Sequence, residues 1–113
     1  MTIKEVSEKT GLSINTLRYY ERTGVMPKVP RNASGIRNYN DESLNWIDII
    51  ICFKRSGVGL ESIREYVQLT LEGEEAKPAR DRLLLEIKGH LEAKMAEIQE
   101  SLDIINNKPD TYN

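Results

Sequence analysis

The sequence predicts a mainly α fold, in which a winged helix-turn-helix domain is followed by a long coiled-coil helix. Two short helical segments flank a glycine turn within residues 3–23, as is typical of a helix-turn-helix. Residues 25–39 have no helical period and contain two prolines, which favours a hairpin, or wing. From residue 79 to about residue 106, apolar residues recur every three or four positions.

The first helix is expected over residues 3–10. Thr2 and Glu5 have the spacing of a capping box, in which each side chain accepts a hydrogen bond from the other residue's backbone N–H. Gly11 ends this helix, because glycine readily adopts the left-handed conformation found at helix C-termini.

The second helix is expected over residues 14–23, with Ser13 as its N-cap. Residues three or four positions apart share one face of a helix. We therefore expect Ile14, Leu17 and Tyr20 to lean towards the core, and Asn15, Arg18, Tyr19 and Arg22 to point outward.

Residues 25–39 are expected to form the wing. Ser34-Gly35 signals a turn, and residues 29–31 and 36–39 are expected as two short strands around it. The hairpin carries three basic residues, Lys28, Arg31 and Arg37.

Two further helices complete the first domain. Asn40 is the expected cap of a helix that runs to about residue 56, and the next helix is expected over residues 60–72. Residues 73–78 are polar and contain glycine and proline, which predicts a linker. The winged helix-turn-helix domain therefore covers residues 1–72.

The last helix is expected over residues 79–106. Its apolar seam follows heptad spacing with one stutter, and it consists of Leu84, Ile87, Leu91, Met95, Ile98, Leu102 and Ile105. A lone helix of this length cannot bury such a stripe, so we expect it to pack against the same helix of a second chain, in a homodimer. Residues 107–113 are expected to be a flexible tail.

Composition limits the class of protein. The chain has 113 residues, about one domain's worth, of which 39% are hydrophobic and 30% charged. No apolar run is long enough to span a membrane and the start lacks a signal-peptide pattern, so no membrane contact is expected. The single cysteine favours a cytoplasmic location. No catalytic set, nucleotide motif or metal-ligand spacing is present, so we expect no enzymatic activity, cofactor or metal.

Charge is distributed unevenly along the chain. Residues 1–58 hold nine basic and six acidic side chains, whereas residues 59–113 hold seven and twelve. Residues 16–39 alone hold five basic and one acidic. The excess of basic residues in the N-terminal half favours a polyanionic partner, although surface charge also varies by chance. Arginine can pair with guanine or phosphate and a tyrosine hydroxyl can reach phosphate, so the second helix and the wing indicate double-stranded DNA.

Three residues near the end of the third helix have two interpretations each. Lys54 and Arg55 can compensate the helix dipole, contact phosphate, or do both. Cys52 follows three isoleucines, and we expect it to be a small buried hydrophobic residue. The alternative is a reactive thiol that acts as a sensor.

Residues 2–66 resemble the MerR family of bacterial transcription regulators. The family's helix-turn-helix is matched by Thr2-Ile3-Lys4-Glu5-Val6, Thr10-Gly11-Leu12-Ser13 and Thr16-Leu17-Arg18-Tyr19-Tyr20-Glu21. Its wing is matched by Gly24-Val25-Met26-Pro27 and by Arg31-Asn32-Ala33-Ser34-Gly35-Ile36-Arg37-Asn38-Tyr39. The turn into the fourth helix is matched by Phe53-Lys54-Arg55-Ser56-Gly57-Val58-Gly59-Leu60, where Ser56 and Gly59 replace the common leucine and serine.

The resemblance implies a homodimer, joined by an antiparallel coiled coil, that binds a palindromic promoter operator. It also implies that the dimer distorts the DNA in response to a signal, so that RNA polymerase can use the promoter. In this family the second helix of the motif is the recognition helix. With the outward face derived above, the expected DNA contacts are Ser13, Asn15, Thr16, Arg18, Tyr19, Tyr20, Arg22, Arg31, Arg37, Tyr39 and Lys54.

The family's effector classes differ in their C-terminal regions. Metal-sensing members carry cysteines around the two ends of the dimerisation helix, and this sequence has none there. Drug-sensing members carry a large ligand domain, and the present sequence stops soon after the coiled coil, so we expect the short form. A single cysteine in the third helix is similar to the aldehyde- and nitrosative-stress-responsive branch, in which Cys52 would be a thiol sensor.

Two other functions remain open from the residues. One is an architectural or excision factor built on the same winged helix, against which the long dimerisation helix argues. The other is a coiled-coil interaction protein whose basic face binds a different acidic partner. Salt dependence separates them, because specific DNA binding keeps a large specificity ratio as salt rises.

Overall fold

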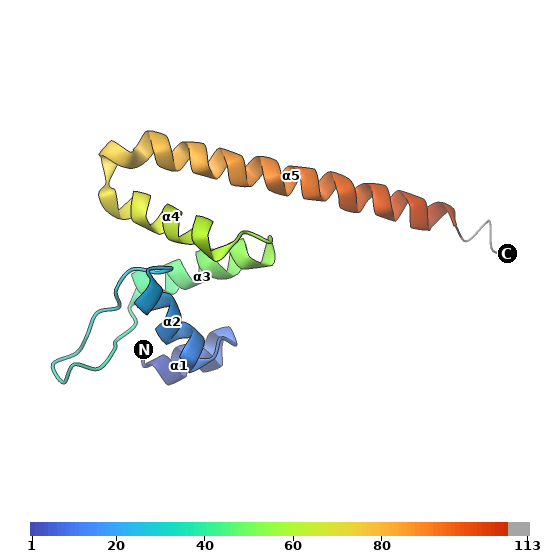
Figure 1. Ribbon diagram of the computed structural model, residues 1–113. Coiled ribbons are helices and arrows are strands. Elements are labelled where there is room, and N and C mark those ends of the chain that lie inside the picture. The colour runs from blue at the N-terminus through green and yellow to red at the C-terminus, as the bar shows by residue number, and fades with distance from the viewer. Residues whose placement is uncertain (109–113) are drawn as a thin grey trace. The chain divides into compact units, whose positions relative to one another are not determined.

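The computed structural model describes residues 1–108, and within them the regular secondary structure is helical apart from one bridging residue pair. The predicted mainly α class is confirmed. Figure 1 shows the elements in chain order: α1 (Ile3–Thr10), α2 (Ile14–Thr23), α3 (Asp41–Arg55), α4 (Leu60–Glu72), the short 3₁₀ turn η1 (Glu74–Ala76) and α5 (Lys77–Asn107). The chain divides into two compact units, Met1–Lys77 and the part that begins at Pro78.

The capping box at the start of α1 is present as predicted. The Thr2 hydroxyl accepts from the Glu5 N–H at 3.1 Å, and the Glu5 carboxylate accepts from the Thr2 N–H at 3.0 Å. These two contacts with Thr2, the backbone one first, hold the pKa of Glu5 below its ordinary value. Gly11 ends α1 with a φ of 77°, a left-handed conformation that glycine adopts without strain.

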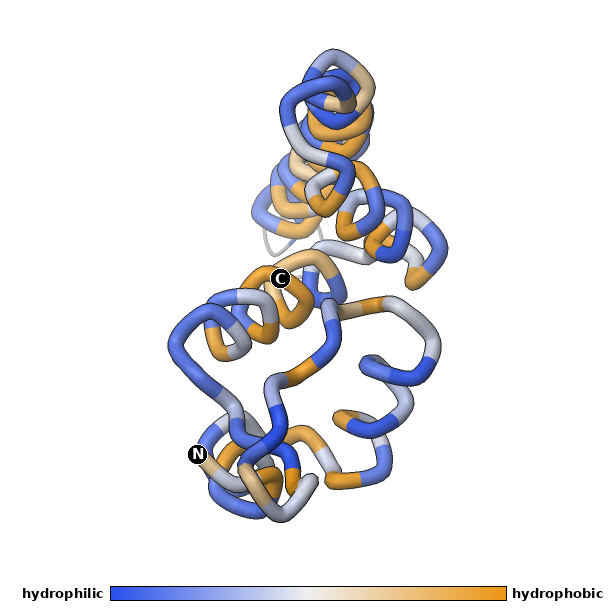
Figure 2. Tube along the Cα trace, turned by 90° about the vertical axis from the view of Figure 1, so that its left-hand side faces the viewer, coloured by the Kyte–Doolittle hydropathy of each residue, from blue (hydrophilic) through white to orange (hydrophobic). Residues whose placement is uncertain are grey.

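The core of the first unit draws apolar side chains from all four of its α-helices. Apolar positions recur among hydrophilic ones along these helices (Figure 2). The buried cluster consists of Val6 from α1, Leu17 and Tyr20 from α2, Ile47 and Ile50 from α3, Ile63 from α4, and Val25, Met26, Val29 and Tyr39 from the segment between α2 and α3. Helix α2 is thus packed against the core on one face and exposed on the other.

Aromatic contacts join α3 to α4. The Tyr66 ring meets Trp46 edge-on at 6.0 Å between centroids and Phe53 at 5.6 Å. Arg64 extends from α4 to α2, where its Nε donates to the Thr23 carbonyl at 2.7 Å. Thr23 is the last residue of α2, so this guanidinium satisfies a free carbonyl at the negative end of the helix dipole.

The wing contains less regular structure than predicted. The expectation of two short strands is wrong in extent, because only Arg31 and Arg37 form an isolated antiparallel bridge. Pro30 has no N–H with which to continue a ladder. At the tip, the Asn32 side chain accepts from the N–H groups of Ser34 and Ile36, so those donors hold the turn.

The region expected as a linker is mostly helical. Residues 74–76 form η1, and Pro78 lies in the first turn of α5, where a missing N–H costs no intrahelical bond. Helix α5 has 31 residues and extends slightly beyond the predicted 79–106 at both ends. Of the predicted tail, residues 109–113 lie outside the described residues. No helix within residues 1–108 combines the length and apolar character needed to cross a membrane.

Candidate nucleic-acid interface

Helix α2 is defined by caps at both ends. The Ser13 hydroxyl accepts from the Thr16 N–H at 3.0 Å and donates to the Thr16 hydroxyl at 2.8 Å. Gly24 ends the helix in a left-handed conformation, with a φ of 79°. Ser13 and Thr16 are both expected to contact DNA. Their side chains therefore hold each other in place at the N-terminal end of α2.

The outward face of α2 agrees with the predicted spacing. Leu17 and Tyr20 are buried, whereas Arg18 and Arg22 are exposed and Tyr19 keeps 39% of its surface accessible. The Arg22 guanidinium carbon lies 5.6 Å from the centre of the Tyr19 ring, a cation–π geometry. The open depression on this face has a volume of about 580 Å³ and is lined by Asn15, Thr16, Arg18, Tyr19 and Arg22.

A second depression, the basic groove, lies between α2 and the wing. Its volume is about 590 Å³, and it is lined by Arg18, Glu21, Arg22, Lys28, Val29, Arg31 and Arg37. Five of these side chains are cationic and one is acidic. Because Arg18 and Arg22 line both depressions, the positive surface continues from α2 to the wing. Such a surface suits a polyanion with regularly spaced phosphates.

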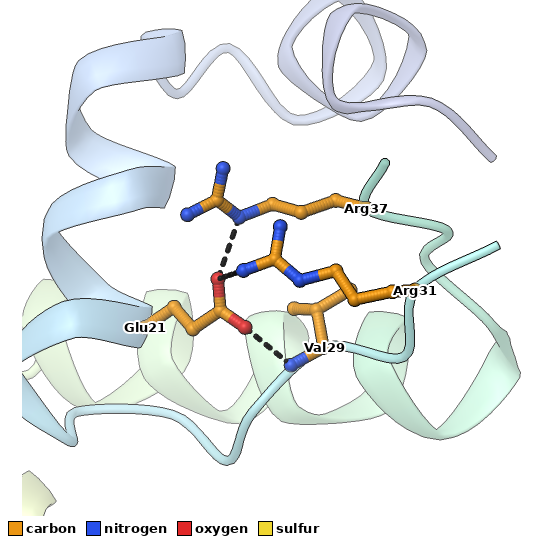
Figure 3. A network of polar contacts seen from close by, with 4 residues as sticks. All are labelled: Glu21, Val29, Arg31 and Arg37. Atoms are coloured by element: carbon orange, nitrogen blue, oxygen red, sulfur yellow. Dashed lines mark hydrogen bonds and ion pairs between the residues drawn. The ribbon is translucent and has the colours of Figure 1, made fainter. Parts of the chain in front are cut away.

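Glu21 holds the inner edge of the basic groove. Figure 3 shows its carboxylate between the wing and α2, where one oxygen accepts from the Val29 N–H at 2.6 Å. The other oxygen accepts from Arg37 Nε at 2.5 Å and faces Arg31 Nη2 at 3.4 Å. Burial would raise the pKa of Glu21, but the hydrogen bonds from Arg37 and Val29 and both arginine charges outweigh it and hold the pKa below its ordinary value.

The role of Glu21 does not follow from its own position in the sequence. Glu21 is the one acidic residue among five basic ones in residues 16–39, and that isolation was the available signal. Its side chain is only 6% exposed, which is unusual for a carboxylate and requires the partners it has.

Tyr20 and Lys54 are brought together from different helices. Tyr20 is 1% exposed, and its hydroxyl accepts a hydrogen bond from Lys54 Nζ at 3.1 Å. Lys54 itself is exposed in the last turn of α3. The lysine is therefore held beside α2 by Tyr20. The expected DNA contact by Tyr20 finds its side chain covered in this structure.

Tyr39 lies in the core rather than on the surface. It is 2% exposed, and its buried hydroxyl has no hydrogen-bond partner within the described residues. Burial, the largest influence, raises the pKa of this hydroxyl. The backbone of Tyr39 pairs with that of Met1, its N–H donating to the Met1 carbonyl at 2.8 Å. The expected phosphate contact by the Tyr39 side chain therefore finds its hydroxyl covered in this structure.

Cys52 is exposed, so the expectation of a buried thiol is wrong. The buried positions of α3 include Trp46, Ile47 and Ile50, and Cys52 stands two residues beyond Ile50, about 200° further around the helix. It lines an open depression of about 360 Å³ together with Lys9, Thr10, Asp48, Ile51 and Arg55.

The predicted seam of α5 is mostly uncovered in a single chain. Met95 is 71% exposed, Ile98 61% and Ile105 61%. Leu84 and Leu102 are also exposed, Leu91 is half-buried and Ile87 is buried. Residues 1–108 contain no cluster of three or more histidine, cysteine or acidic side chains suited to a metal ion.

Residues 1–70 match the family model of MerR HTH family regulatory proteins. The chain is 43% identical over 84 residues to the HTH-type transcriptional regulator AdhR of Bacillus subtilis, across 74% of this chain and 60% of AdhR. The aligned part thus spans less than two thirds of that relative. An HTH-type transcriptional regulator of Haemophilus influenzae is 30% identical over 107 residues, which cover 95% of this chain and 79% of the relative.

Two solved structures resemble this chain along nearly its whole length. A MerR family transcriptional regulator from Listeria monocytogenes superposes with a TM-score of 0.93 at 40% identity, across 99% of this chain and 85% of that one. HiNmlR, a MerR family regulator lacking the sensor domain and solved bound to promoter DNA, gives a TM-score of 0.89 at 30% identity, across 98% and 88%.

Proposed function

The chain belongs to the MerR family of helix-turn-helix regulatory proteins, and we propose that it binds double-stranded promoter DNA as a homodimer. It is a DNA-binding transcriptional regulator of the MerR type and not an enzyme. The relative HiNmlR was solved on promoter DNA, which supports the same ligand for this chain. We assign DNA binding to residues 1–72 and dimerisation to residues 79–106, joined through residues 73–78.

The basic groove carries this proposal. It connects the exposed face of α2 to the wing through Arg18 and Arg22, and it adds Lys28, Arg31 and Arg37. A helix can enter the major groove while a hairpin contacts the backbone beside it. Arg18 and Tyr19 are the proposed base or backbone readers, and Ser13, Asn15 and Thr16 flank them at the N-terminal end of α2.

The dimer is proposed from the apolar seam. Met95, Ile98 and Ile105 would be costly to leave in water, and burial against a second copy recovers about 25 cal/mol for each Å² covered. An antiparallel coiled coil relates the two recognition helices by a two-fold axis. Such a dimer binds a palindrome with half-sites one or more helical turns apart.

Regulation is proposed to act through the geometry of the bound DNA. The dimer distorts the operator in response to a signal and so changes how RNA polymerase uses the promoter. Deformation of this kind costs on the order of 1–6 kcal/mol, and the coupling energy of one effector, about 1–3 kcal/mol, covers the lower part of that range.

Cys52 is the proposed site of that signal. Its exposure allows an electrophile to reach the sulfur, and the cationic side chains of Lys9 and Arg55 line the same depression. The depression belongs to α1, which packs against α2, and to α3, whose Lys54 donates a hydrogen bond to Tyr20 of α2. Modification of Cys52 would therefore alter contacts that position α2.

The test is selection of duplex DNA from a random pool by the purified chain, followed by sequencing. The proposal expects enrichment of an inverted repeat. Enrichment of a single half-site would contradict the dimeric mode, and no enrichment above the unselected pool would contradict sequence-specific DNA binding altogether.

A further inference from the structure

One carboxylate connects the recognition helix to three points of the wing. Glu21 lies in the last turn of α2, and its partners are the Val29 N–H at the wing's base and the guanidiniums of Arg31 and Arg37 on its two sides (Figure 3). Arg31 and Arg37 are also the single bridging pair of the hairpin. The contact therefore spans the full width of the wing.

The base of the wing is anchored, because Val29 and Tyr39 are buried and Tyr39 pairs with Met1, but the outer part of the wing has few other constraints on its direction. Residues 32–36 at its tip are all exposed, and its ladder is limited to one pair. Two like charges directly opposite each other in a hairpin repel, and Arg31 and Arg37 are in that position. Glu21 offsets the repulsion and holds both arginines towards α2. The distance between the recognition helix and the wing therefore depends on this side chain.

If Glu21 acted only through its charge, it would oppose DNA binding. A carboxylate beside the basic groove repels phosphate, so its removal alone would strengthen binding to any DNA. Glu21 does not, however, occupy all the hydrogen-bond donors of Arg31 and Arg37, so both arginines can still donate to phosphate. Arg37 uses only Nε towards Glu21, and Arg31 uses only one terminal nitrogen. In Figure 3 the two terminal nitrogens of Arg37 point away from the carboxylate.

We propose that Glu21 is a positioning residue, which holds the wing at a fixed separation from the recognition helix before DNA arrives. Both elements then meet one stretch of DNA without the cost of ordering the wing at the moment of binding. The inference rests on the proposed DNA-binding function. It assigns Glu21 to the geometry of the interface and not to DNA contact.

Glu21→Gln distinguishes positioning of the wing from simple charge repulsion of phosphate. It is nearly isosteric and can still accept from the Val29 N–H, but it no longer carries the charge that holds the arginines. The control is Glu8→Gln, which removes an equal charge from an exposed position on α1. Affinities are measured for the selected operator and for a scrambled duplex of the same length and composition.

Positioning predicts that Glu21→Gln weakens operator binding by about tenfold, the scale of one charge-assisted hydrogen bond, while scrambled DNA binds as well as before or better. Glu8→Gln should leave the ratio of the two affinities unchanged. If Glu21→Gln strengthens operator and scrambled binding alike, the carboxylate acts through its charge alone and the proposal is overturned.

A second readout needs no DNA. Backbone ¹⁵N relaxation of the Ser34 and Gly35 amides reports wing motion on the ps–ns timescale. Order parameters at the wing tip should fall in Glu21→Gln and stay unchanged in Glu8→Gln, and an unaltered wing in Glu21→Gln contradicts positioning. Should wild-type protein fail to distinguish operator from scrambled DNA, the proposed function fails, while the relaxation comparison still decides the role of Glu21.

A double variant tests whether the loss of operator affinity in Glu21→Gln arises through Arg37 and not from a general folding defect. If Glu21 acts through Arg37, then Arg37→Gln already removes most of the effect, and adding Glu21→Gln costs little further operator affinity. Full additivity of the two losses would mean that Glu21 acts independently of the arginine, which contradicts the proposal.

Discussion

Lys54 Nζ donates a hydrogen bond to the hydroxyl oxygen of Tyr20 across 3.1 Å, and the same ammonium lies 5.7 Å from the centre of the Tyr20 ring. The lysine belongs to α3 and the tyrosine to α2. Because Tyr20 is buried, it is a fixed support, and the charge of Lys54 is held beside the recognition helix.

Lys54→Ala should weaken binding to all DNA sequences about equally. Loss of one phosphate contact should also lower the slope of log affinity against log salt by about one, measured by fluorescence anisotropy at several salt concentrations. Tyr20→Phe keeps the buried ring but removes the hydroxyl that Lys54 donates to. It should reduce DNA affinity less than Lys54→Ala does, by on the order of 1 kcal/mol, the worth of one hydrogen bond. Lys94→Ala on exposed α5 is the matched control, and an equal change in its salt slope would remove the assignment of Lys54.

Asp at both Leu91 and Ile98 should convert the proposed dimer into monomers, because two carboxylates of each chain would have to be buried in the seam. The molecular mass is measured by light scattering, and DNA affinity by anisotropy. Ala93→Asp with Ala96→Asp adds the same charge at exposed positions outside the seam and should leave the dimer intact. A tight dimer in the seam variant would show that the interface lies elsewhere.

Cys52→Ser should retain DNA binding and lose the response to electrophiles. The variant replaces one exposed atom, so the fold should not change. Transcription from the target promoter is measured in cells exposed to an aldehyde, with wild-type protein as the reference. Undiminished induction in the variant would exclude the thiol as the sensor.

The Glu21 network predicts a specific dependence of stability on pH. The folded-state pKa of Glu21 lies below the ordinary glutamate value of 4.5, so its stabilisation is fully present above that value and is lost as pH falls through the folded pKa. Glu21→Gln should lower the free energy of unfolding by about 1.5 to 3 kcal/mol at neutral pH. The difference from wild type should shrink in acid. Chemical denaturation at fixed protein concentration measures both, and a pH-independent difference would mean that the carboxylate's charge is not what stabilises the fold.

Local signals predicted most of the helical fold. The capping box at Thr2 and the caps at Ser13 and Asn40 gave the starts of α1, α2 and α3, because capping depends on neighbours within four residues. The outward face of α2 followed from helical spacing alone. The extent of the wing's strands did not, because Pro30 lacks an N–H and the Asn32 side chain accepts from the N–H groups of Ser34 and Ile36 at the tip.

Long-range contacts could not be predicted in the same way. The partners of Glu21 lie 8, 10 and 16 residues away in sequence, and their meeting depends on how the wing folds back. The exposure of Cys52 was missed because it lies in a nearly continuous apolar run, Ile49-Ile50-Ile51-Cys52-Phe53, in which no period marks the buried face. Tyr39 was expected at the surface by family resemblance, and the core contains it.

The most direct test of the central claim is the ratio of operator affinity to scrambled-DNA affinity, measured as salt is raised, for wild type and Arg18→Ala. Specific readout by α2 predicts that the wild-type ratio stays at least about 10³ as both affinities fall, and that Arg18→Ala lowers operator affinity by about 1–3 kcal/mol with relaxed preference at one position of the site. A ratio near one, fading uniformly with salt and unaffected by Arg18→Ala, would mean that the basic surface serves a generic acidic partner and not an operator.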